Sequence, residues 1–418
     1  MGNLAALEKD LLEALKKDGA RLLEQALNDP DLPLANNQRL PGEEDFGLRS
    51  KEVLCLLGPL HLRRHYFYDA RRGEGRFPLD QALGLVDGYS PEVTRWMCRA
   101  AAMAGSYEAA SQDLLTYAGL NVDGRQIQRM VEQIGPLMDD WHQAQPAVFD
   151  PTLGEVFCVT TDGTGAPMRK KALKGRKGKN GRARTREVKV GAVFTHRAAT
   201  PDKKPLRDHH STSYLAEITS AQDFGGLLRA EALRRGLAKA KVVVFLGDGA
   251  AWVWGVARIN FPQAICILDY YHAAEHLALL ANALYGEGTP ESKKHFRKWR
   301  KGLLKDKVGE IIVQATTDLP KQGKGRKLAK KQIAYFKRNQ ARMQYQTFRA
   351  AGYFIGSGVV EAACKTVVGQ RFKQSGMLWS VKGACHLLTI RCALLSRWFN
   401  DFWNHRNTLP GAVLRAAA

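Results

Sequence analysis

The segment GEVFCVTTDGTG, residues 154–165, is an apolar and β-branched run that leads into Asp162-Gly163. A second segment of the same kind, KVVVFLGDGA at residues 241–250, leads into Asp248-Gly249. Continuous apolar runs of this length are typical of strands buried on both faces of a sheet. The two segments therefore predict neighbouring strands of a buried sheet, each followed directly by a carboxylate.

These two carboxylates are candidates for a metal site. An acid at the end of a buried strand is held rigidly and faces the crevice at the strand ends. Mg²⁺ prefers oxygen ligands and keeps several waters, so a few carboxylates are enough to bind it, and Mn²⁺ can take its place. Asp-Gly is also a common turn dipeptide. Its repetition after two buried strands favours a site formed by Asp162 and Asp248.

The sequence around these segments alternates strands and helices. Further strands are predicted at 187–196 and 211–219, with helices at 221–236 and 251–258, and residues 264–277 fit a strand that runs into a helix. Three strands, a helix, a strand, a helix and a strand is the order of an RNase H-like core. We therefore predict an α/β fold with such a catalytic core, a mixed five-stranded sheet with flanking helices.

The regions on either side of this core are mainly helical. Residues 4–27 have the leucine spacing of an amphipathic helix, and residues 51–68 fit two short strands around Gly58-Pro59. Residues 278–350 are basic and helical without a strand pattern, which predicts an all-α insertion. The predicted domains are 1–45, N-terminal helix and linker; 46–89, β-hairpin region; 90–147, helix-turn-helix-like; 148–277, first part of the core; 278–350, insertion; 351–405, C-terminal core helices; and 406–418, tail.

Three helices are predicted at roughly 91–104, 107–118 and 124–142, the first beginning at Ser90-Pro91. The second and third have helix-turn-helix proportions. Arg125 and Arg129 on the third are placed to contact base edges or phosphates. A plain helical bundle with a solvated polar face explains the same pattern equally well.

The charge of the chain is strongly positive. It has 418 residues with 63 Lys and Arg against 41 Asp and Glu, a net charge of +22. Such a charge favours a polyanionic partner because phosphate binding releases counterions. Double-stranded DNA is the leading candidate, and a basic enzyme without nucleic acid is the alternative.

Much of this charge lies in MRKKALKGRKGKNGRARTREVK, residues 168–189, which has eleven basic residues and one acid. The segment follows Asp162 closely and is placed to embrace DNA, although a merely solubilising loop would have the same composition. The DNA-binding residues predicted in it are Lys170, Lys171, Lys174, Arg176 and Lys177.

The seven cysteines form no Cys-x-x-Cys pair, which favours a reducing cytoplasm over a disulfide framework. The N-terminal helix carries acids and does not resemble a signal peptide. No apolar run approaches the length of a membrane span. We therefore expect a cytoplasmic, nucleoid-associated protein without a membrane partner.

A third carboxylate lies in YFIGSGVVEAACKTVVGQRFKQSGMLWS, residues 353–380. Glu361 is the only acid between Gly352 and Asn400. It lies four residues before Lys365, so a surface ion pair on one helix is one reading. A metal ligand beside a DNA-contacting lysine is the other, and the residues alone do not separate the two.

The segments TTDGT, FLGDGA, ILDYYHAAEHL and the Gly-Ser-Gly-Val-Val-Glu block resemble those of DDE transposases from bacterial insertion sequences, the ISKra-type family above all. The resemblance covers about 150–400. It implies a catalytic triad of Asp162, Asp248 and Glu361. It also implies that His272, in a motif similar to the family's Asp-x-x-His signature, orients groups or contacts phosphate near the site; a core histidine is the open alternative.

The resemblance further implies the activity. Two divalent cations held by the triad would support cleavage at transposon ends and strand transfer into target DNA. Lys365, Arg371 and Lys373 would bind backbone phosphates. A homodimer or higher oligomer is expected because two element ends must be paired. Many family members carry a Cys pair where this chain has residues 68–71, Tyr-Asp-Ala-Arg, so zinc is not expected.

Three other functions compete with this one. A structure-selective nuclease of the junction-resolvase type would use the same chemistry, and a non-catalytic DNA-binding regulator would keep only the binding. The insertion and the intact triad favour a transposase over both. A nucleotide-binding oxidoreductase is excluded because Trp252 stands where the dinucleotide fingerprint needs its third glycine.

Overall fold

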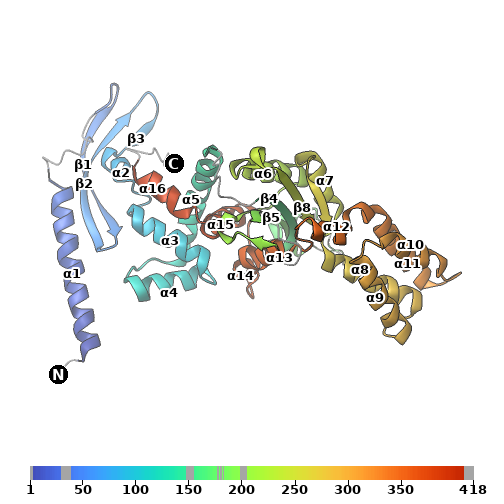
Figure 1. Ribbon diagram of the computed structural model, residues 1–418. Helices are drawn as coiled ribbons and strands as arrows, with labels where there is room; N and C mark the ends of the chain where they lie inside the picture. Colours follow the sequence, from blue (N-terminus) through green and yellow to red (C-terminus); the bar gives the residue numbers. More distant parts are fainter. Residues whose placement is uncertain are drawn as a thin grey trace. The chain divides into compact units, whose positions relative to one another are not determined.

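The computed structural model describes residues 3–29, 39–146, 155–176, 178, 181, 183–197 and 205–408. They fall into two compact units (Figure 1). The first is drawn from Met1–His142 together with Arg397–Ala418, and the second from Gln143–Ser396. Within the described ranges, no helix has both the length and the apolar character needed to cross a bilayer.

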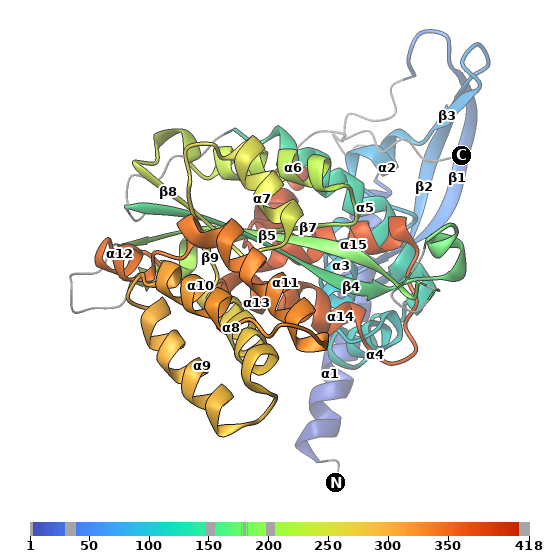
Figure 2. The same cartoon turned by 90° about the vertical axis from the view of Figure 1, so that its right-hand side faces the viewer.

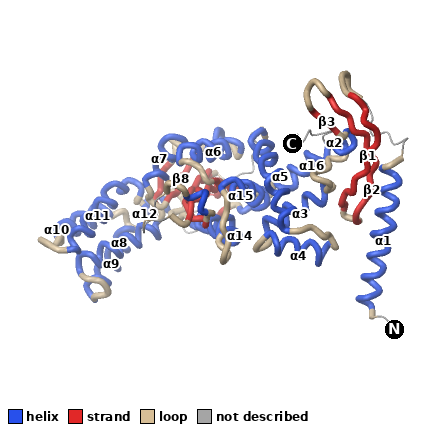
Figure 3. Tube along the Cα trace, turned by 180° about the vertical axis from the view of Figure 1, so that it is seen from behind, coloured by secondary structure: helices blue, strands red, loops and turns tan. Residues whose placement is uncertain are grey.

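The first unit begins with a long helix that packs on a small sheet. Helix α1 (Leu4–Leu27) occupies the residues predicted for it. Strands β1 (Glu44–Cys55), β2 (Gly58–Asp69) and β3 (Glu74–Arg76) form an antiparallel sheet in that order. The first two are longer than the two short strands that were predicted. Figure 3 shows α1 beside β1 and β2, with its first half projecting beyond them.

The rest of this unit is helical: α2 (Pro78–Ala82), α3 (Pro91–Met103), α4 (Tyr107–Ala118), α5 (Gly124–Ala144) and α16 (Phe399–Thr408). The three helices predicted from residue 91 onward are present with nearly the predicted bounds. Local signals explain this accuracy, since the Ser90 hydroxyl accepts from the Val93 N–H at the start of α3. Gly119 ends α4 with a left-handed φ of 68°.

The second unit is built on a mixed sheet. Its strands are β4 (Val156–Pro167), β5 (Thr185–Arg197), β6 (Leu206–Arg207), β7 (Ser213–Glu217), β8 (Val242–Gly247) and β9 (Ile265–Leu268). The order is β6-β5-β4-β8-β9, and β7 also pairs with β5. Strands β4, β8 and β9 are parallel, whereas β5 is antiparallel to β4, β6 and β7. The predicted five strands are all present, and the short β6 adds a sixth.

Helices cover both faces of this sheet (Figure 2). Because side chains alternate along a strand, Phe157 and Val159 point to one face, where they pack with α6 (Ala221–Arg234) and α7 (Ala251–Asn260). Val156 and Cys158 point to the other face and share a core with α8 (Tyr270–Tyr285). The β4 sequence is apolar on both sides because both sides are buried.

A helical region follows α8 and is free of strands throughout its described residues, as predicted. It comprises α9 (Pro290–Leu303), α10 (Val308–Thr317), α11 (Lys324–Asn339) and α12 (Tyr345–Ala350). Trp299, Phe336 and Tyr345 are almost fully buried and join its core to that beneath the sheet.

The second unit closes with four short or medium elements. These are α13 (Gly358–Ala363), the π-helix η5 (Cys364–Gly369), α14 (Gln370–Phe372) and α15 (Val381–Leu395). Four short 3-10 helices also connect the described elements, and of these only η1 (Lys170–Leu173), directly after β4, bears on the site. Elements α13 and η5 lie against β4, which brings the end of the chain's second unit next to Asp162.

Candidate active site

The sheet register places two of the predicted carboxylates at one level. Strands β4 and β8 are parallel, and their last paired residues are Thr160 and Leu246. Two residues further along each chain come Asp162 and Asp248. Because adjacent strands lie about 4.8 Å apart, residues at the same level of two parallel strands are neighbours.

The two aspartates nevertheless differ in their backbone setting. Asp248 follows the end of β8 at Gly247, as predicted, and its Oδ1 accepts the Ala250 N–H at 3.0 Å. Asp162 lies inside β4, so the prediction that it follows the end of a strand was wrong. The antiparallel ladder with β5 extends to Pro167 and keeps this part of the chain extended, although pairing with β8 has already ended.

Asp162 lies in a half-buried environment next to other acids. Its Oδ1 accepts the Gly163 N–H at 2.6 Å, and the Cys364 thiol donates to its Oδ2 at 3.7 Å. Burial raises the pKa of Asp162, and the charges of Asp248 and Glu361 raise it further against those two hydrogen bonds. Asp162 is therefore close enough to both Asp248 and Glu361 to interact with each of them electrostatically.

Glu361 lies on α13, exposed to solvent, and is held by a neighbouring serine. The Ser357 hydroxyl lies 3.0 Å from Glu361 Oε1. Among the described ion pairs, none joins Glu361 to Lys365. The π-helix η5 begins at Cys364 and changes the spacing of side chains just there, so the ordinary four-residue helical pairing is not realised.

Ser357 connects Glu361 to a buried acid, Asp269. The Asp269 side chain is 1% exposed, and its Oδ1 accepts the His272 N–H at 2.6 Å, which caps α8. Its Oδ2 accepts the Ser357 N–H at 2.5 Å and lies 3.0 Å from the Ser357 hydroxyl. That hydroxyl has one proton, so it donates to Asp269 or to Glu361 but not to both at once.

Ser357 was not among the predicted site residues, and Asp269 was predicted only as part of a motif. The Gly-Ser-Gly turn before Glu361 was the available signal. A small hydroxyl residue just before a helix often makes hydrogen bonds to nearby polar groups. What the sequence could not show is that its partner would be an acid 88 residues earlier.

A cavity of about 590 Å³ opens beside these residues. Its lining is formed by Asp162, Thr164, Glu361, Cys364, Lys365, Gly369, Gln370 and Lys373. Lys373 Nζ donates to the Thr164 hydroxyl at 2.6 Å. Two predicted triad acids and two predicted phosphate-binding lysines are therefore brought together, with the lysines able to balance the acids electrostatically.

The donor atoms at this site fit Mg²⁺ or Mn²⁺ in kind, because carboxylate oxygens are the ligands these ions prefer. Burial and then two like charges raise the pKa of Asp162, and a bound cation would stabilise its ionised form. The acids do not, however, already form a complete metal-binding site. Across the described ranges, no three His, Cys, Asp or Glu side chains meet closely enough to hold a metal ion.

A buried arginine supports the unusual backbone beside Asp162. Arg391 of α15 is 5% exposed, and its Nε donates to the Val367 carbonyl at 2.7 Å while Nη2 donates to that of Thr366. Both carbonyls belong to η5. Burial lowers the pKa of Arg391 to about 10, which leaves it charged at neutral pH. This arginine thereby satisfies backbone groups of the wide turn that carries Cys364.

His272 lies in the first turn of α8, beside the site but not in the lining of the cavity. Its Nδ1 is 3.8 Å from Glu275 Oε2, and its ring is 5.1 Å from that of His276. The backbone N–H groups of His272 and Ser357 both donate to the Asp269 carboxylate, which connects the two residues. The catalytic role implied for its ring stays a prediction.

Outside the cavity, six of the predicted DNA-binding residues are exposed, in two places. Lys170, Lys171, Lys174 and Arg176 are exposed in and after η1, while Lys177 lies outside the described residues. Arg125 and Arg129 are exposed on α5 of the first unit. Their accessibility is compatible with DNA binding, which stays a prediction for all of them.

Arg371 does not fit the phosphate-binding role that was predicted for it. Its side chain is 1% exposed, its Nη1 lies 3.6 Å from Met377 Sδ, and its guanidinium lies 5.1 Å from the Trp379 ring. In the sequence Arg371 stands between Gln370 and Phe372, and in the short α14 (Gln370–Phe372) it is turned inward against the tryptophan. In this structure its guanidinium packs against Trp379 and Met377.

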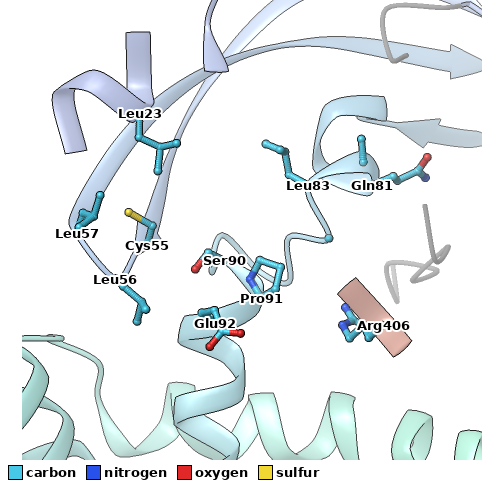
Figure 4. Close-up of a pocket in the computed structure, with 12 residues that line it drawn as sticks. Leu23, Cys55, Leu56, Leu57, Gln81, Leu83, Ser90, Pro91, Glu92 and Arg406 are labelled. Atoms are coloured by element: carbon cyan, nitrogen blue, oxygen red, sulfur yellow. The ribbon is translucent and has the colours of Figure 1, made fainter. Parts of the chain in front are cut away.

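A second cavity, of about 420 Å³, lies within the first unit (Figure 4). Leu23, Cys55 and Leu83 give it an apolar wall, and Arg406 lies at its side. Burial lowers the pKa of Arg406. The wall offers no group of carboxylates, so this cavity has no part in the chemistry predicted for Asp162.

The chain was compared with known proteins. No curated protein matches it. A solved structure described as the Drosophila P element transposase strand transfer complex aligns with a TM-score of 0.28 and 8% identity, over 78% of this chain and 83% of that one. A likeness this weak carries no argument about fold or activity. The model of the uncharacterised protein family UPF0236 matches residues 2–397, and the chain belongs to this family.

Proposed function

We propose that this protein is a DDE transposase of the ISKra type, which cleaves DNA at transposon ends and joins the ends to target DNA. The observation that carries the proposal is the placement of Asp162 and Asp248 at one level of adjacent parallel strands, with Glu361 in the same cavity as Asp162. The strand order of the second unit supports it, since β7-β5-β4-β8-β9 with β5 antiparallel is the arrangement expected of an RNase H-like core.

In this proposal Asp162, Asp248 and Glu361 hold the divalent cations. Mg²⁺ bound there would supply an activated nucleophile and stabilise the leaving oxygen of the scissile phosphate. Asp162 has both acids within electrostatic range and is the central member. The Asp269 carboxylate holds Ser357 through its backbone N–H, and the Ser357 hydroxyl orients Glu361 when it donates to that carboxylate.

The basic side chains around the cavity give the DNA its path. Lys365 and Lys373 line the cavity itself and are placed to bind phosphates that flank the scissile bond. Exposed Lys170 and Lys171 follow β4, the strand that carries Asp162. The stretch 319–400 contains a single acid, Glu361, so little negative charge opposes a bound duplex.

The test is a cleavage and joining assay. The full chain is incubated with Mg²⁺ and a labelled duplex that bears candidate element ends, and we expect nicks at the 3′ ends followed by joined products. Nicks without joining would favour a structure-selective nuclease. Tight, salt-sensitive binding without any cleavage would favour a DNA-binding regulator.

The acid assignment is tested with one substitution and a matched control. Asp248→Asn removes a proposed ligand without changing side-chain size, so cleavage should fall by a factor of about a thousand or more while duplex binding is kept. Asp401→Asn changes an exposed aspartate of the first unit and should leave both unchanged. An Asp248→Asn protein that cleaves at the normal rate refutes the triad.

A further inference from the structure

Helix α11 of the helical insertion has an exposed face that is mainly basic. The helix contains no acid in its 16 residues. One face packs against α8 (Figure 2) and buries Gln332, Tyr335 and Phe336. Apart from Leu328 and Ala334, the exposed residues of α11 are Lys324, Lys327, Lys330, Lys331, Lys337 and Arg338. Like charges on neighbouring turns of a helix repel one another, so an anionic ligand would stabilise this face.

Acids of the neighbouring helices have other partners. Glu310 of α10 is paired with Lys307 at 2.9 Å, and Glu275 of α8 lies 3.8 Å from His272 Nδ1. Among the ion pairs of the described residues, none includes a basic side chain of α11. The positive charge of this face is therefore available to an anion from outside the chain.

One edge of the basic face adjoins the turn that carries Asp248. The Tyr335 hydroxyl lies 3.5 Å from the Asp248 carbonyl oxygen, and a Cβ at Gly249 would be only 2.8 Å from that hydroxyl. At about 100° per residue, Lys331 and Arg338 lie within roughly 60° of Tyr335 around the helix axis. Burial and then Asp248 raise the pKa of Tyr335, and Arg338 lowers it. These two cations therefore stand on the side of α11 nearest Asp248.

The opposite edge of the same face offers a comparison. Lys330 and Lys337 are exposed as well, but they lie roughly 140–160° from Tyr335 around the helix axis. The two pairs of cations belong to one helix and carry the same charge. They differ in whether they stand beside the Asp248 turn or away from it.

A basic side chain also lies beside the other aspartate of the proposed triad. Lys373 Nζ donates to the Thr164 hydroxyl at 2.6 Å, two residues beyond Asp162 on β4. Strands β4 and β8 are adjacent, so both proposed metal ligands have cations near them. A duplex carries one negative charge for about every 1.7 Å of its axis, so one that passes both aspartates offers phosphates to both sets of cations.

We propose that Lys331 and Arg338 of α11 bind backbone phosphates of the duplex that is cut, on one flank of the scissile bond. The inference rests on the proposed function and gives part of the helical insertion a place in the DNA-binding surface. Lys324 lies seven residues before Lys331 and continues the same row, which spans about 21 Å, or about six base pairs. Contacts of this kind position a duplex without reading its sequence.

The first test compares two double variants of the full chain. Lys331→Ala with Arg338→Ala removes the row beside Asp248, and Lys330→Ala with Lys337→Ala removes equal charge from the opposite edge. Fluorescence anisotropy with a labelled duplex that bears candidate element ends measures binding, with Ca²⁺ in place of Mg²⁺ to prevent cleavage. All four side chains are exposed, so both variants should keep the melting temperature of the wild type.

The first variant should bind at least about tenfold more weakly than the wild type at about 150 mM KCl. The magnitude of its salt slope should fall by about 1.8, which is about 0.9 for each lost phosphate contact. The second variant should stay close to the wild type in both measurements. Equal losses in the two variants would mean that bulk charge alone is responsible, and this result, or wild-type binding by the first variant, overturns the proposal.

The second test locates the contact with shortened duplexes. Once the cleavage assay has given the position of the cut, two duplexes are made that end at the scissile phosphate on one side or on the other. With the duplex that lacks the flank bound by α11, the wild type and the Lys331→Ala, Arg338→Ala variant should bind equally. With the other duplex their difference should remain. A difference that persists with both duplexes overturns the placement on one flank.

A third measurement separates the cut duplex from the target duplex. If the Lys331→Ala, Arg338→Ala variant binds and cleaves element ends normally but joins them poorly to target DNA, the row binds the target and the proposal is wrong. If both double variants cleave and join as the wild type does, only the proposal for α11 is refuted. If the wild type binds a duplex without nicking it, the transposase is refuted and, with it, the placement of the row beside a scissile bond.

Discussion

At the scale of single residues, the site depends on acids that repel one another. Asp162 is half-buried, and Asp248 and Glu361 both raise its pKa. Like charges near a partly buried carboxylate oppose its ionisation, and this cost is present in the folded chain only. Such a cost is typical of sites that are built to bind a cation rather than to stabilise the fold.

This cost makes the stability of the protein depend on pH. Because the folded pKa of Asp162 is raised above its ordinary value of 3.8, the folded state holds the proton more tightly than the unfolded state. Stability from this group therefore falls as the pH rises from 3.8 through the raised pKa and stays reduced above it. Asp162→Asn removes the charge and should raise the melting temperature at pH 7 in the presence of EDTA.

Calorimetry across pH checks the origin of that effect. The gain from Asp162→Asn should shrink as the pH is lowered, because the wild-type carboxyl then becomes neutral too. Asp401→Asn, at an exposed position, should show no comparable trend. An Asp162→Asn variant that melts below the wild type at pH 7 would show that the charge is not the source of strain.

At the scale of elements, two buried polar groups position the segment with Glu361 and Cys364. Asp269 binds the start of α13 to the start of α8 through Ser357. Arg391 binds η5 to α15 through two backbone carbonyls. A π-helix is a rare conformation that occurs often at functional sites. Here it lets the Cys364 thiol reach Asp162 while the lysine that follows faces the cavity.

Replacing Arg391 should disturb this arrangement. Arg391→Met keeps much of the volume but leaves the carbonyls of Thr366 and Val367 without their donor, and unfolding free energy should fall by about 2–4 kcal/mol. The measurement is denaturant unfolding in parallel with the cleavage assay. Cleavage should fall even where the variant is fully folded, since η5 loses its support.

Arg349→Met is the control for this substitution. Arg349 is exposed on α12, so its removal should change the unfolding free energy by no more than about 0.5 kcal/mol. If the two variants are equally stable, the hydrogen bonds from Arg391 do not hold η5.

At the scale of the whole molecule, the positive charge is spread unevenly. The net charge is +22, and residues 168–189 and 319–400 hold a large share of the basic residues with one acid each. All but the last four residues of these stretches belong to the second unit, which also carries Asp162 and its cavity. Charge gathered around a cleft focuses the field there and attracts a polyanion to it.

Duplex binding should therefore weaken steeply with salt. The logarithm of the binding constant should fall linearly with the logarithm of the KCl concentration, by about 0.9 for each phosphate contacted. Reversing Lys170, Lys171 and Lys174 to Glu should lower the magnitude of this slope by about 2–3 if each contacts one phosphate. Fluorescence anisotropy with a labelled duplex measures it.

A variant with equal net charge separates contact from bulk charge. Lys9→Glu, Arg49→Glu and Arg63→Glu reverse three exposed charges of the first unit. This variant should keep the wild-type slope. Equal slopes for both triple variants would mean that η1 makes no phosphate contacts.

The sequence by itself determined most of the elements of this protein and two of its three candidate acids. Local signals such as the Ser90 cap and Gly119 fix where helices begin and end, because they act within a few residues. The apolar runs before Asp162 and Asp248 predicted buried strands because burial on both faces leaves no room for polar side chains. The third acid, Glu361, rested on resemblance, since an isolated acid on a helix has no local signature.

Only the tertiary structure decided how these residues meet. The register of β4 on β8 sets Asp162 level with Asp248, and the fold brings Asp269 to Ser357 across 88 residues of chain. It also turned Arg371 inward, against the prediction of a phosphate contact. The physical reason is that strand register and side-chain burial depend on contacts between segments distant in sequence, which no local pattern encodes.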